Sequence, residues 1–208
     1  MSAAVRRSPL AHREPVEAAD AVLRLRERSF EAKLIVRAHV GDAGKAFADA
    51  FGAEAPDNCR FVETDDGVAI AWLSPDEFLV IGAQGAEAGL TARLTDALGD
   101  SHHQTVNVTD YYTTLELAGP RAREALMKLT TLDMHARAFA HGDAKGTVFG
   151  HCNAWILQRR DDAEDGGPAF DLIVRWSHAD YLYCALADSG REWDMPEVVP
   201  VGGEKLLP

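Results

Sequence analysis

The sequence predicts an α+β fold in which two β-α-β-β-α lobes pack against each other in one compact chain. Segments that alternate apolar and polar residues at period two are interleaved with segments of helical spacing, and this order occurs twice. The matching first strands of the two halves lie about 80 residues apart. With 208 residues, 47% of them hydrophobic and 26% charged, the chain has the composition of a folded globular protein.

The chain is expected to begin with an extended arm over residues 1–21, because this stretch is polar and carries Pro9 and Pro15. Two strands are predicted to follow, at residues 22–27 and 33–39. Arginine alternates with leucine along the first of them. This alternation predicts a solvent-facing row of arginines, namely Arg24, Arg26 and Arg28.

The first helix is predicted to start at Asp42, a suitable N-cap, and to end at Gly52. Apolar residues recur along it at helical spacing and define its inner face: Ala43, Ala46, Phe47, Ala50 and Phe51. A loop is expected over residues 53–60. In the first lobe, a predicted strand is therefore followed directly by the first predicted helix.

A hairpin and a second helix are predicted to complete the first lobe. The hairpin strands are expected at residues 68–73 and 78–81, around the turn Ser74-Pro75-Asp76, where proline fits the backbone of the turn. The helix is expected from residue 86 to 98 and ends at Gly99. A short strand that contains valines leads into the second half.

The second half opens with the most informative segment of the chain, a strand that turns into a helix. Residues 113–117 alternate at period two, which predicts a half-buried strand. Gly119 permits the turn, and Pro120 is predicted to occupy the first position of a helix that runs to Leu129.

A second hairpin and a last helix are predicted to close the second lobe. The hairpin pairs residues 147–159 with 170–175, and the acidic stretch 161–168 is expected to be its solvated turn. The helix is expected over residues 179–187. Ser177-His178-Ala179-Asp180 has the spacing of a capping box at its start.

The chain is thus predicted to divide into an arm, a two-lobed domain and a tail. These parts are residues 1–21, residues 22–191 (lobes at about 22–103 and 104–191) and residues 192–208. The tail is apolar, yet Pro196, Pro200 and Gly202-Gly203 exclude a regular helix. Such a segment needs a cover, which either a partner subunit or the chain's own lobes would supply.

Charge and composition exclude several classes of function. The net charge is −12 and no large basic stripe offsets it, so neither nucleic acid nor an anionic membrane is an expected partner. No stretch approaches the ~20 apolar residues of a membrane span, and the N-terminus lacks a signal-peptide core. The odd, widely spaced cysteines (Cys59, Cys152 and Cys184) predict reduced thiols in the cytoplasm, with Cys184 in a core.

The sequence predicts no catalytic, cofactor-binding or metal-binding residue. The adjacent pairs His102-His103 and His151-Cys152 point their side chains in opposite directions in an extended segment. Asp76-Glu77 is interpreted as part of a turn, although it is also a pair of carboxylates. Asp110 is either an Asx-turn residue or a pocket carboxylate. No glycine-rich dinucleotide or phosphate loop is present.

Five strings occur in an order that resembles the gamma-subunit family of heterotetrameric sarcosine oxidase, from about residue 6 to 193. They are Arg7-Ser8-Pro9-Leu10, the stretch from Trp72 to Val80, the stretch from Asp110 to Leu126, the stretch from Leu132 to Phe139, and the stretch from Val174 to Leu182. The strand–glycine–helix segment is also similar to the folate-binding aminomethyltransferase superfamily. The resemblance therefore implies an aminomethyltransferase-like fold.

The aminomethyltransferases place two adjacent aspartates at the start of a strand, and one of these carboxylates acts on the one-carbon group. By order and spacing, that place falls near Gly150-His151-Cys152-Asn153 here, where no aspartate stands. Without the carboxylate, the chemistry of that superfamily has no obvious proton acceptor. The fold resemblance persists while the catalytic resemblance fails.

The resemblance implies a non-catalytic, cytoplasmic gamma subunit that supports the oxidative demethylation of sarcosine to glycine. It implies alpha, beta and delta subunits as partners, with FAD, FMN, NAD and tetrahydrofolate held by sister subunits. The chain would be part of an oxidoreductase but inactive alone. Two alternatives stay open, a solitary folate-binding regulatory module and a stand-alone aminomethyltransferase.

Overall fold

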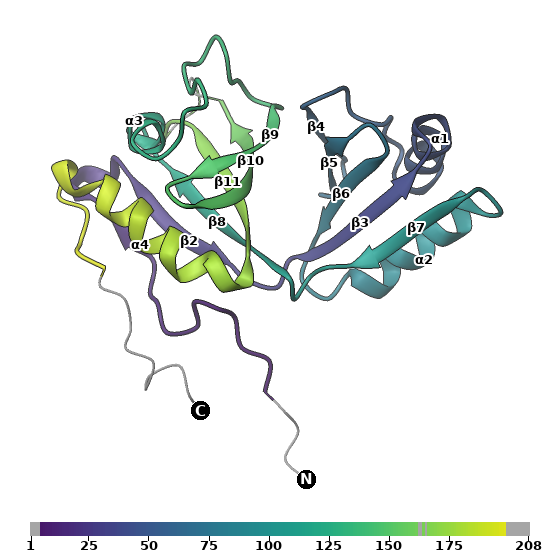
Figure 1. The fold of residues 1–208 in the computed structure, drawn as a ribbon, viewed down its shortest axis with the longest axis horizontal. Coiled ribbons are helices and arrows are strands. Elements are labelled where there is room, and N and C mark those ends of the chain that lie inside the picture. Colours follow the sequence, from purple (N-terminus) through teal and green to yellow (C-terminus); the bar gives the residue numbers. More distant parts are fainter. Residues whose placement is uncertain (1–4, 162–163, 165, 199–208) are drawn as a thin grey trace.

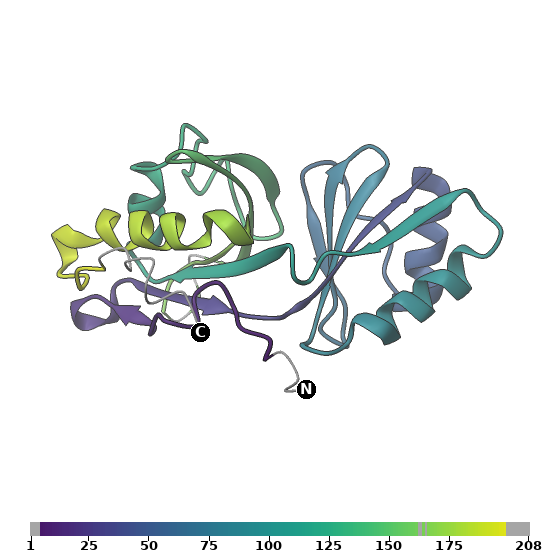
Figure 2. The same cartoon turned by 60° about the horizontal axis from the view of Figure 1, so that its bottom comes forward.

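The computed structural model describes residues 5–161, 164 and 166–198, and it has four layers. Two antiparallel sheets face each other at the centre, and a pair of helices covers the outer face of each (Figure 1). An α+β architecture of two packed lobes is therefore confirmed. The two lobes are joined near residues 30 and 110, where the chain passes twice between the sheets (Figure 2).

The first lobe is built from one continuous stretch of chain. Its elements are β3 (Ala32–Ala38), α1 (Val40–Phe51), β4 (Phe61–Glu63), β5 (Ala69–Ser74), β6 (Glu77–Gly82), α2 (Glu87–Leu98) and β7 (His103–Asn107). The sheet order is β4-β5-β6-β3-β7, with all neighbours antiparallel. Both helices end at a glycine as the sequence predicts, Gly52 and Gly99. The short strand β4 was not expected from the sequence.

The start of α1 differs from the expectation. The helix begins at Val40, and His39 is its N-cap, with the imidazole Nδ1 accepting the backbone N–H of Gly41 at 3.3 Å. Asp42 therefore lies inside the first turn, where its carboxylate still interacts favourably with the helix dipole. An imidazole nitrogen can accept a capping hydrogen bond as a carboxylate does, so the two candidate caps are hard to rank from sequence.

The second lobe combines the C-terminal half of the chain with two strands from its start. It contains β1 (Val16–Glu17), β2 (Arg24–Arg28), β8 (Tyr112–Ala118), α3 (Ala122–Met127), β9 (Ala144–Phe149), β10 (Cys152–Arg160), β11 (Ala169–Arg175) and α4 (Ala179–Ser189). The sheet order is β1-β2-β8-β11-β10-β9. Single 3-10 turns lie at Ala19–Ala21, Trp176–His178 and Arg191–Trp193.

Strand β2 lies in the second lobe, although the sequence division at about residue 22 places it in the first. It pairs antiparallel with β8, whereas its sequence neighbour β3 pairs with β6 and β7 in the other sheet. The position of β2 beside β8 matches that of β7 beside β3. Each sheet thus has a fifth strand in the same place, but the second lobe takes this strand from the N-terminus.

The strand–glycine–helix segment folds with two corrections. Strand β8 is buried on both faces, because Thr114 is covered by the opposite sheet, so it is not half-buried. Helix α3 starts at Ala122, two residues after Pro120, and the N–H of Ala122 donates to the Gly119 carbonyl at 3.0 Å. Gly119 has φ +130°, and a Cβ there would lie 2.4 Å from the Val22 oxygen, so only glycine fits.

The long strand predicted at 147–159 is two strands joined by a tight turn. β9 and β10 pair from Cys152 with Phe149, and Gly150 adopts φ +58° in the turn. The start of α4 also differs from the expectation, because its N-cap is His178 and no side chain caps it. The Asp180 carboxylate instead pairs with the N-terminal arm, which sequence spacing alone did not reveal.

Three apolar clusters follow the four layers. One fills each lobe between sheet and helices, and a third lies between the two sheets. Leu126 and Leu94 are fully buried in the cores of the second and first lobes, respectively. Met195 is 2% exposed and belongs to the core of the second lobe, so the described part of the tail docks on its own lobe. Residues 199–208 of the predicted tail lie outside the described residues.

Candidate functional site

The seam between the two sheets is apolar at one end. Small and branched side chains from both sheets meet there: Ala69, Ala71, Leu79 and Ile81 from the first lobe, with Ala144, Leu157 and Ile173 from the second. The edge strands also meet directly, because the N–H of Phe61 donates to the Gly142 carbonyl at 2.8 Å. This end of the seam joins the lobes by close packing.

The other end of the seam holds a network of buried charges. Asp171, 1% exposed, accepts from Arg28 at 2.6 Å and lies 3.3 Å from the guanidinium of Arg159. Arg28 also pairs with Glu31 at 2.8 Å, and Glu31 lies 3.6 Å from the fully buried Lys33. The network crosses from β11 to β3 and therefore ties the two lobes together.

The row of arginines on β2 is only partly a solvent face. Arg24 and Arg26 are exposed as expected, and Arg26 makes a two-point hydrogen bond to Glu116, with both distances 2.8 Å. Arg28, in contrast, turns into the seam toward Asp171. The correction follows from the pairing of β2 with β8, which places its inner end opposite the first lobe.

Burial sets the protonation behaviour of this network. Loss of hydration raises the pKa of Asp171 to about 6, against the lowering effect of Arg28 and Arg159. Burial also lowers the pKa of Lys33. Among the described residues, several buried atoms of the network have no hydrogen-bond partner: Arg28 Nε, Thr114 Oγ1, Arg159 Nη1 and Asp171 Oδ1. The hydrogen-bonding capacity of this network is therefore only partly satisfied.

A pocket of about 450 Å³ includes Asn153, the last residue of the stretch in which the aminomethyltransferase carboxylates are expected. It is lined by Tyr112, Gly146, Thr147, Asn153, Ala154, Trp155, Ile173, Arg175 and His178. The indole of Trp155 lies over Gly146, where an added Cβ would approach the ring to 3.1 Å. Two aromatic side chains, Tyr112 from β8 and Trp155 from β10, therefore line this pocket.

The ionisable groups that line this pocket are a phenol, a guanidinium and an imidazole. Its described lining contains no carboxylate, and burial raises the pKa of Tyr112, so this phenol stays neutral near pH 7. Arg175 supplies a cation, 5.3 Å from the Tyr111 ring. The His178 Nδ1 is buried without a hydrogen-bond partner among the described residues. The described lining therefore offers two aromatic rings, one guanidinium and one imidazole, but no carboxylate base.

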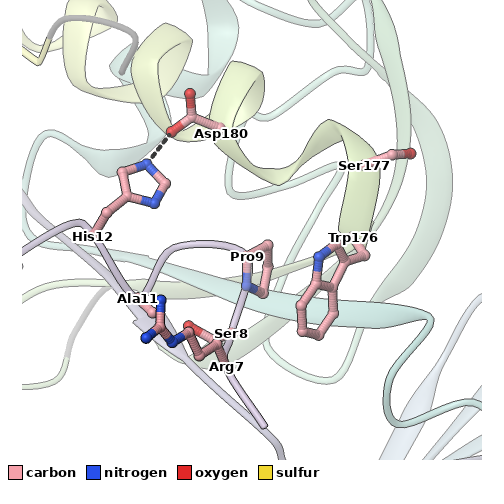
Figure 3. A pocket seen from close by; sticks show the side chains of 8 residues that line it. All are labelled: Arg7, Ser8, Pro9, Ala11, His12, Trp176, Ser177 and Asp180. Carbon is pink, nitrogen blue, oxygen red and sulfur yellow. Dashed lines mark hydrogen bonds and ion pairs between the residues drawn. The ribbon is translucent and has the colours of Figure 1, made fainter. Parts of the chain in front are cut away.

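A second hollow, of about 530 Å³, lies between the N-terminal arm and the start of α4 (Figure 3). Its walls are Arg7, Ser8, Pro9, Ala11 and His12 from the arm, with Trp176, Ser177 and Asp180 opposite. The His12 Nε2 lies 3.1 Å from Asp180, and Arg13 donates to the same carboxylate oxygen at 2.8 Å. Sequence reasoning missed this hollow because the arm has no regular structure to place it.

The histidines and cysteines weighed from the sequence do not form a reactive group. His151 is exposed, whereas the Cys152 thiol is buried against the Phe149 carbonyl, and burial raises its pKa. His102 and His103 line a shallow hollow near Asp76, and no cluster among the described residues could hold a metal ion. Cys184 is half-buried rather than in the core, and Arg13 donates to its sulfur at 3.3 Å.

The carboxylates weighed from the sequence have structural partners. Asp76 stands in the predicted hairpin turn and pairs with Arg37 at 3.1 Å, which lowers its pKa. Asp110 pairs with Arg6 at 2.6 Å, while the local Asx contact is made by Asn107, which accepts the N–H of Thr109. Within the described residues, no helix has the length and apolarity needed to span a membrane.

The chain is similar to known proteins over most of its length. The model of the sarcosine oxidase gamma subunit family matches residues 38–192. A sarcosine oxidase subunit gamma from an Arthrobacter species is 38% identical over 203 residues, which are 95% of this chain and 96% of the relative.

Solved structures agree with the sequence relatives. The heterotetrameric sarcosine oxidase from Corynebacterium sp. U-96, in complex with pyrrole 2-carboxylate, contains a chain with a TM-score of 0.77 and 28% identity, and the match covers 93% of this chain and 99% of that one. The glycine cleavage system aminomethyltransferase T from Bartonella henselae has a TM-score of 0.62 at 15% identity, over 80% of this chain and 46% of that one. The second likeness shows the aminomethyltransferase-like fold alone. The chain belongs to the sarcosine oxidase gamma subunit family.

Proposed function

We propose that this chain is the non-catalytic gamma subunit of a cytoplasmic heterotetrameric sarcosine oxidase, with alpha, beta and delta subunits as its partners. The observation that carries the proposal is the match along nearly the whole chain to a protein named as subunit gamma. The solved relative is part of a heterotetramer, which supports an assembly of the same kind here. The sister subunits hold FAD, FMN, NAD and tetrahydrofolate, and this chain contributes packing surface.

The pocket at Tyr112 and Trp155 supports the non-catalytic part of the proposal. Aminomethyl transfer in that superfamily uses a carboxylate, and the described lining of this pocket contains none. The nearest acidic network, around Asp171, is buried in ion pairs with Arg28 and Arg159. A carboxylate held in this way serves the joint between the lobes.

Co-expression tests the proposal. The tagged chain is produced with the alpha, beta and delta subunits of the proposed assembly, and the purified material is assayed for sarcosine-dependent formation of hydrogen peroxide and glycine. We expect the chain to co-purify with its partners in an active complex. The chain purified alone should be colourless and should oxidise no sarcosine. Flavin absorbance that co-elutes stoichiometrically with the single chain would contradict the proposal.

One observation favours a second candidate, a folate-binding regulatory module. The rings of Tyr112 and Trp155 and the cation Arg175 line one pocket, and this combination suits a flat heterocycle that carries a carboxylate. Titration of the purified chain with tetrahydrofolate, followed by tryptophan fluorescence, separates the two functions. Saturable binding that Arg175→Ala abolishes would support the module, and no binding would leave the packing role.

A further inference from the structure

The arm contributes one unpaired arginine to the hollow, whereas its other two described arginines are in ion pairs. Arg6 pairs with Asp110 at 2.6 Å and Arg13 pairs with Asp180 at 2.6 Å. Arg7, between them, is exposed and makes no hydrogen bond or ion pair with the described part of the chain. Asp180, the carboxylate in the wall, is already bound by Arg13 and His12. Arg7 is therefore a lining cation without a carboxylate partner among the described residues, while the nearby Glu27 is held by the hydroxyls of Ser8 and Thr113.

The walls of the hollow are fixed before any ligand arrives. Leu10 of the arm is buried in the core of the second lobe and anchors the arm there. The Ser8 hydroxyl donates to Glu27 at 2.6 Å, and the Tyr183 hydroxyl donates to the Glu14 carbonyl at 2.7 Å. A preformed groove binds a partner at a low cost in ordering its own side chains.

The surface around Arg7 has the residue types of a protein interface. Trp176 and Pro9 lie beside each other and form the apolar part of the lining (Figure 3). Tryptophan, tyrosine and arginine are the residues that most often dominate binding energy at interfaces. Apolar walls with one free guanidinium suit an extended segment that carries a carboxylate between apolar residues.

We propose that the groove between the arm and α4 receives an acidic segment of a sister subunit. A carboxylate of that segment binds Arg7, and its apolar flank packs against Pro9 and Trp176. The inference rests on the proposed function, because it requires an assembly. The unpaired guanidinium of Arg7 favours an occupant that carries a carboxylate.

Photo-crosslinking in the intact complex identifies the occupant. Ser177 is exposed in the wall of the groove, so a photoreactive amino acid at this position should leave the fold unchanged. After irradiation, mass spectrometry of the crosslinked peptide should reveal a segment of a sister subunit that contains aspartate or glutamate. A crosslink to residues 199–208 of the same chain, to a second copy of it or to no protein would overturn the proposal.

Charge reversal measures the role of Arg7. We expect Arg7→Glu to weaken the affinity of the chain for its partners about 10-fold or more, and Arg7→Lys to weaken it less, because lysine keeps the charge but not the two-point geometry. Arg137→Glu is the matched control: Arg137 is also exposed and also makes no side-chain pair with the described residues. Equal affinities for the Arg7→Glu and Arg137→Glu variants would overturn the proposal. If the wild-type chain binds no partner at all, the proposed function itself fails, which is a distinct result.

Discussion

The two lobes share one sheet order but obtain their strands differently. The first lobe takes all its strands from one stretch, residues 32–107, whereas the second lobe borrows β2 and β1 from the N-terminus. The second lobe also receives the arm and the described part of the tail, and both hollows border it. The first lobe is therefore built from one stretch of chain, whereas the second lobe depends on residues near both ends.

Removal of residues 1–28 should produce the largest difference in stability between the two lobes. It deletes β2 with the fully buried Leu23 and Leu25, each worth about 1.5–3 kcal/mol on burial, and exposes an edge of β8. We expect hydrogen exchange to show loss of protection in β8 and β11 but retained protection in β3 and β6. Removal of residues 1–5 is the control. Protection of β8 equal to that of the full chain would show that the borrowed strand is dispensable.

Truncation of one core leucine in each lobe compares the two cores directly. Leu126→Ala and Leu94→Ala each remove a fully buried side chain and should each lower the free energy of unfolding by about 2–5 kcal/mol. Urea unfolding followed by fluorescence measures both. Met127→Ala, at an exposed position beside Leu126, should change it by less than about 0.5 kcal/mol. A loss near zero for Leu126→Ala would mean that α3 does not pack as described.

The joint between the lobes should respond to pH through Asp171. Its pKa in the folded chain is about 6, above the ordinary value of 3.8, so the folded state holds this proton more tightly than the unfolded state. The stability that this contributes is present below about pH 4 and is lost as the pH rises through about 6. The loss amounts to about 3 kcal/mol, since a tenfold change in proton affinity corresponds to about 1.4 kcal/mol.

Asp171→Asn should remove this dependence. We expect the free energy of unfolding of the variant to fall less than that of the wild type between pH 4 and 6, as measured by urea titrations at several pH values. Asp76→Asn is the control, because Asp76 is an exposed carboxylate whose pKa is lowered by Arg37. Parallel pH profiles for the wild type and Asp171→Asn would contradict the pKa of about 6.

The described tail should stabilise the second lobe by a smaller amount. Met195 is buried in the core of that lobe, and Met195→Ala should cost about 1.5–3 kcal/mol. The measurement is the thermal midpoint of the isolated chain, with the exposed Glu197→Ala as control. An unchanged midpoint for Met195→Ala would favour the other expectation from the sequence, in which a partner subunit covers the tail.

The smallest effect should come from shortening the acidic stretch. Deletion of residues 162–165 spares Gly166 and Gly167, whose carbonyls accept hydrogen bonds from Arg160. Loop closure depends only logarithmically on length, so the free energy of unfolding should change by about 0.6 kcal/mol or less. A large drop of the thermal midpoint would assign a packing role to this stretch.

Much of the fold follows from local sequence patterns. The helix ends at Gly52 and Gly99, the turn at Ser74-Pro75-Asp76 and the inner face of α1 are confirmed, although Ala50 of that face is only partly buried. These features depend on residues close in sequence. The partner of β2 depends on a contact 90 residues away, between Arg26 and Glu116, which no local pattern encodes.

The site features show the same limit. The missing carboxylates near Asn153 were visible in the sequence, because they are a matter of residue type at one place. The charge network around Asp171 and the groove beside Arg7 were not, because each joins segments from opposite ends of the chain. Arginine beside leucine on a strand predicts a polar face but not what lies opposite.

We propose above all that this chain works as a packing subunit within an oxidase assembly. Native mass spectrometry of the tagged chain, isolated from the cells that encode it, tests this claim most directly. We predict a single complex that contains one copy of this chain with three different partner chains and that produces hydrogen peroxide from sarcosine. A monomer or homo-oligomer without partners, isolated under the same conditions, would contradict the claim.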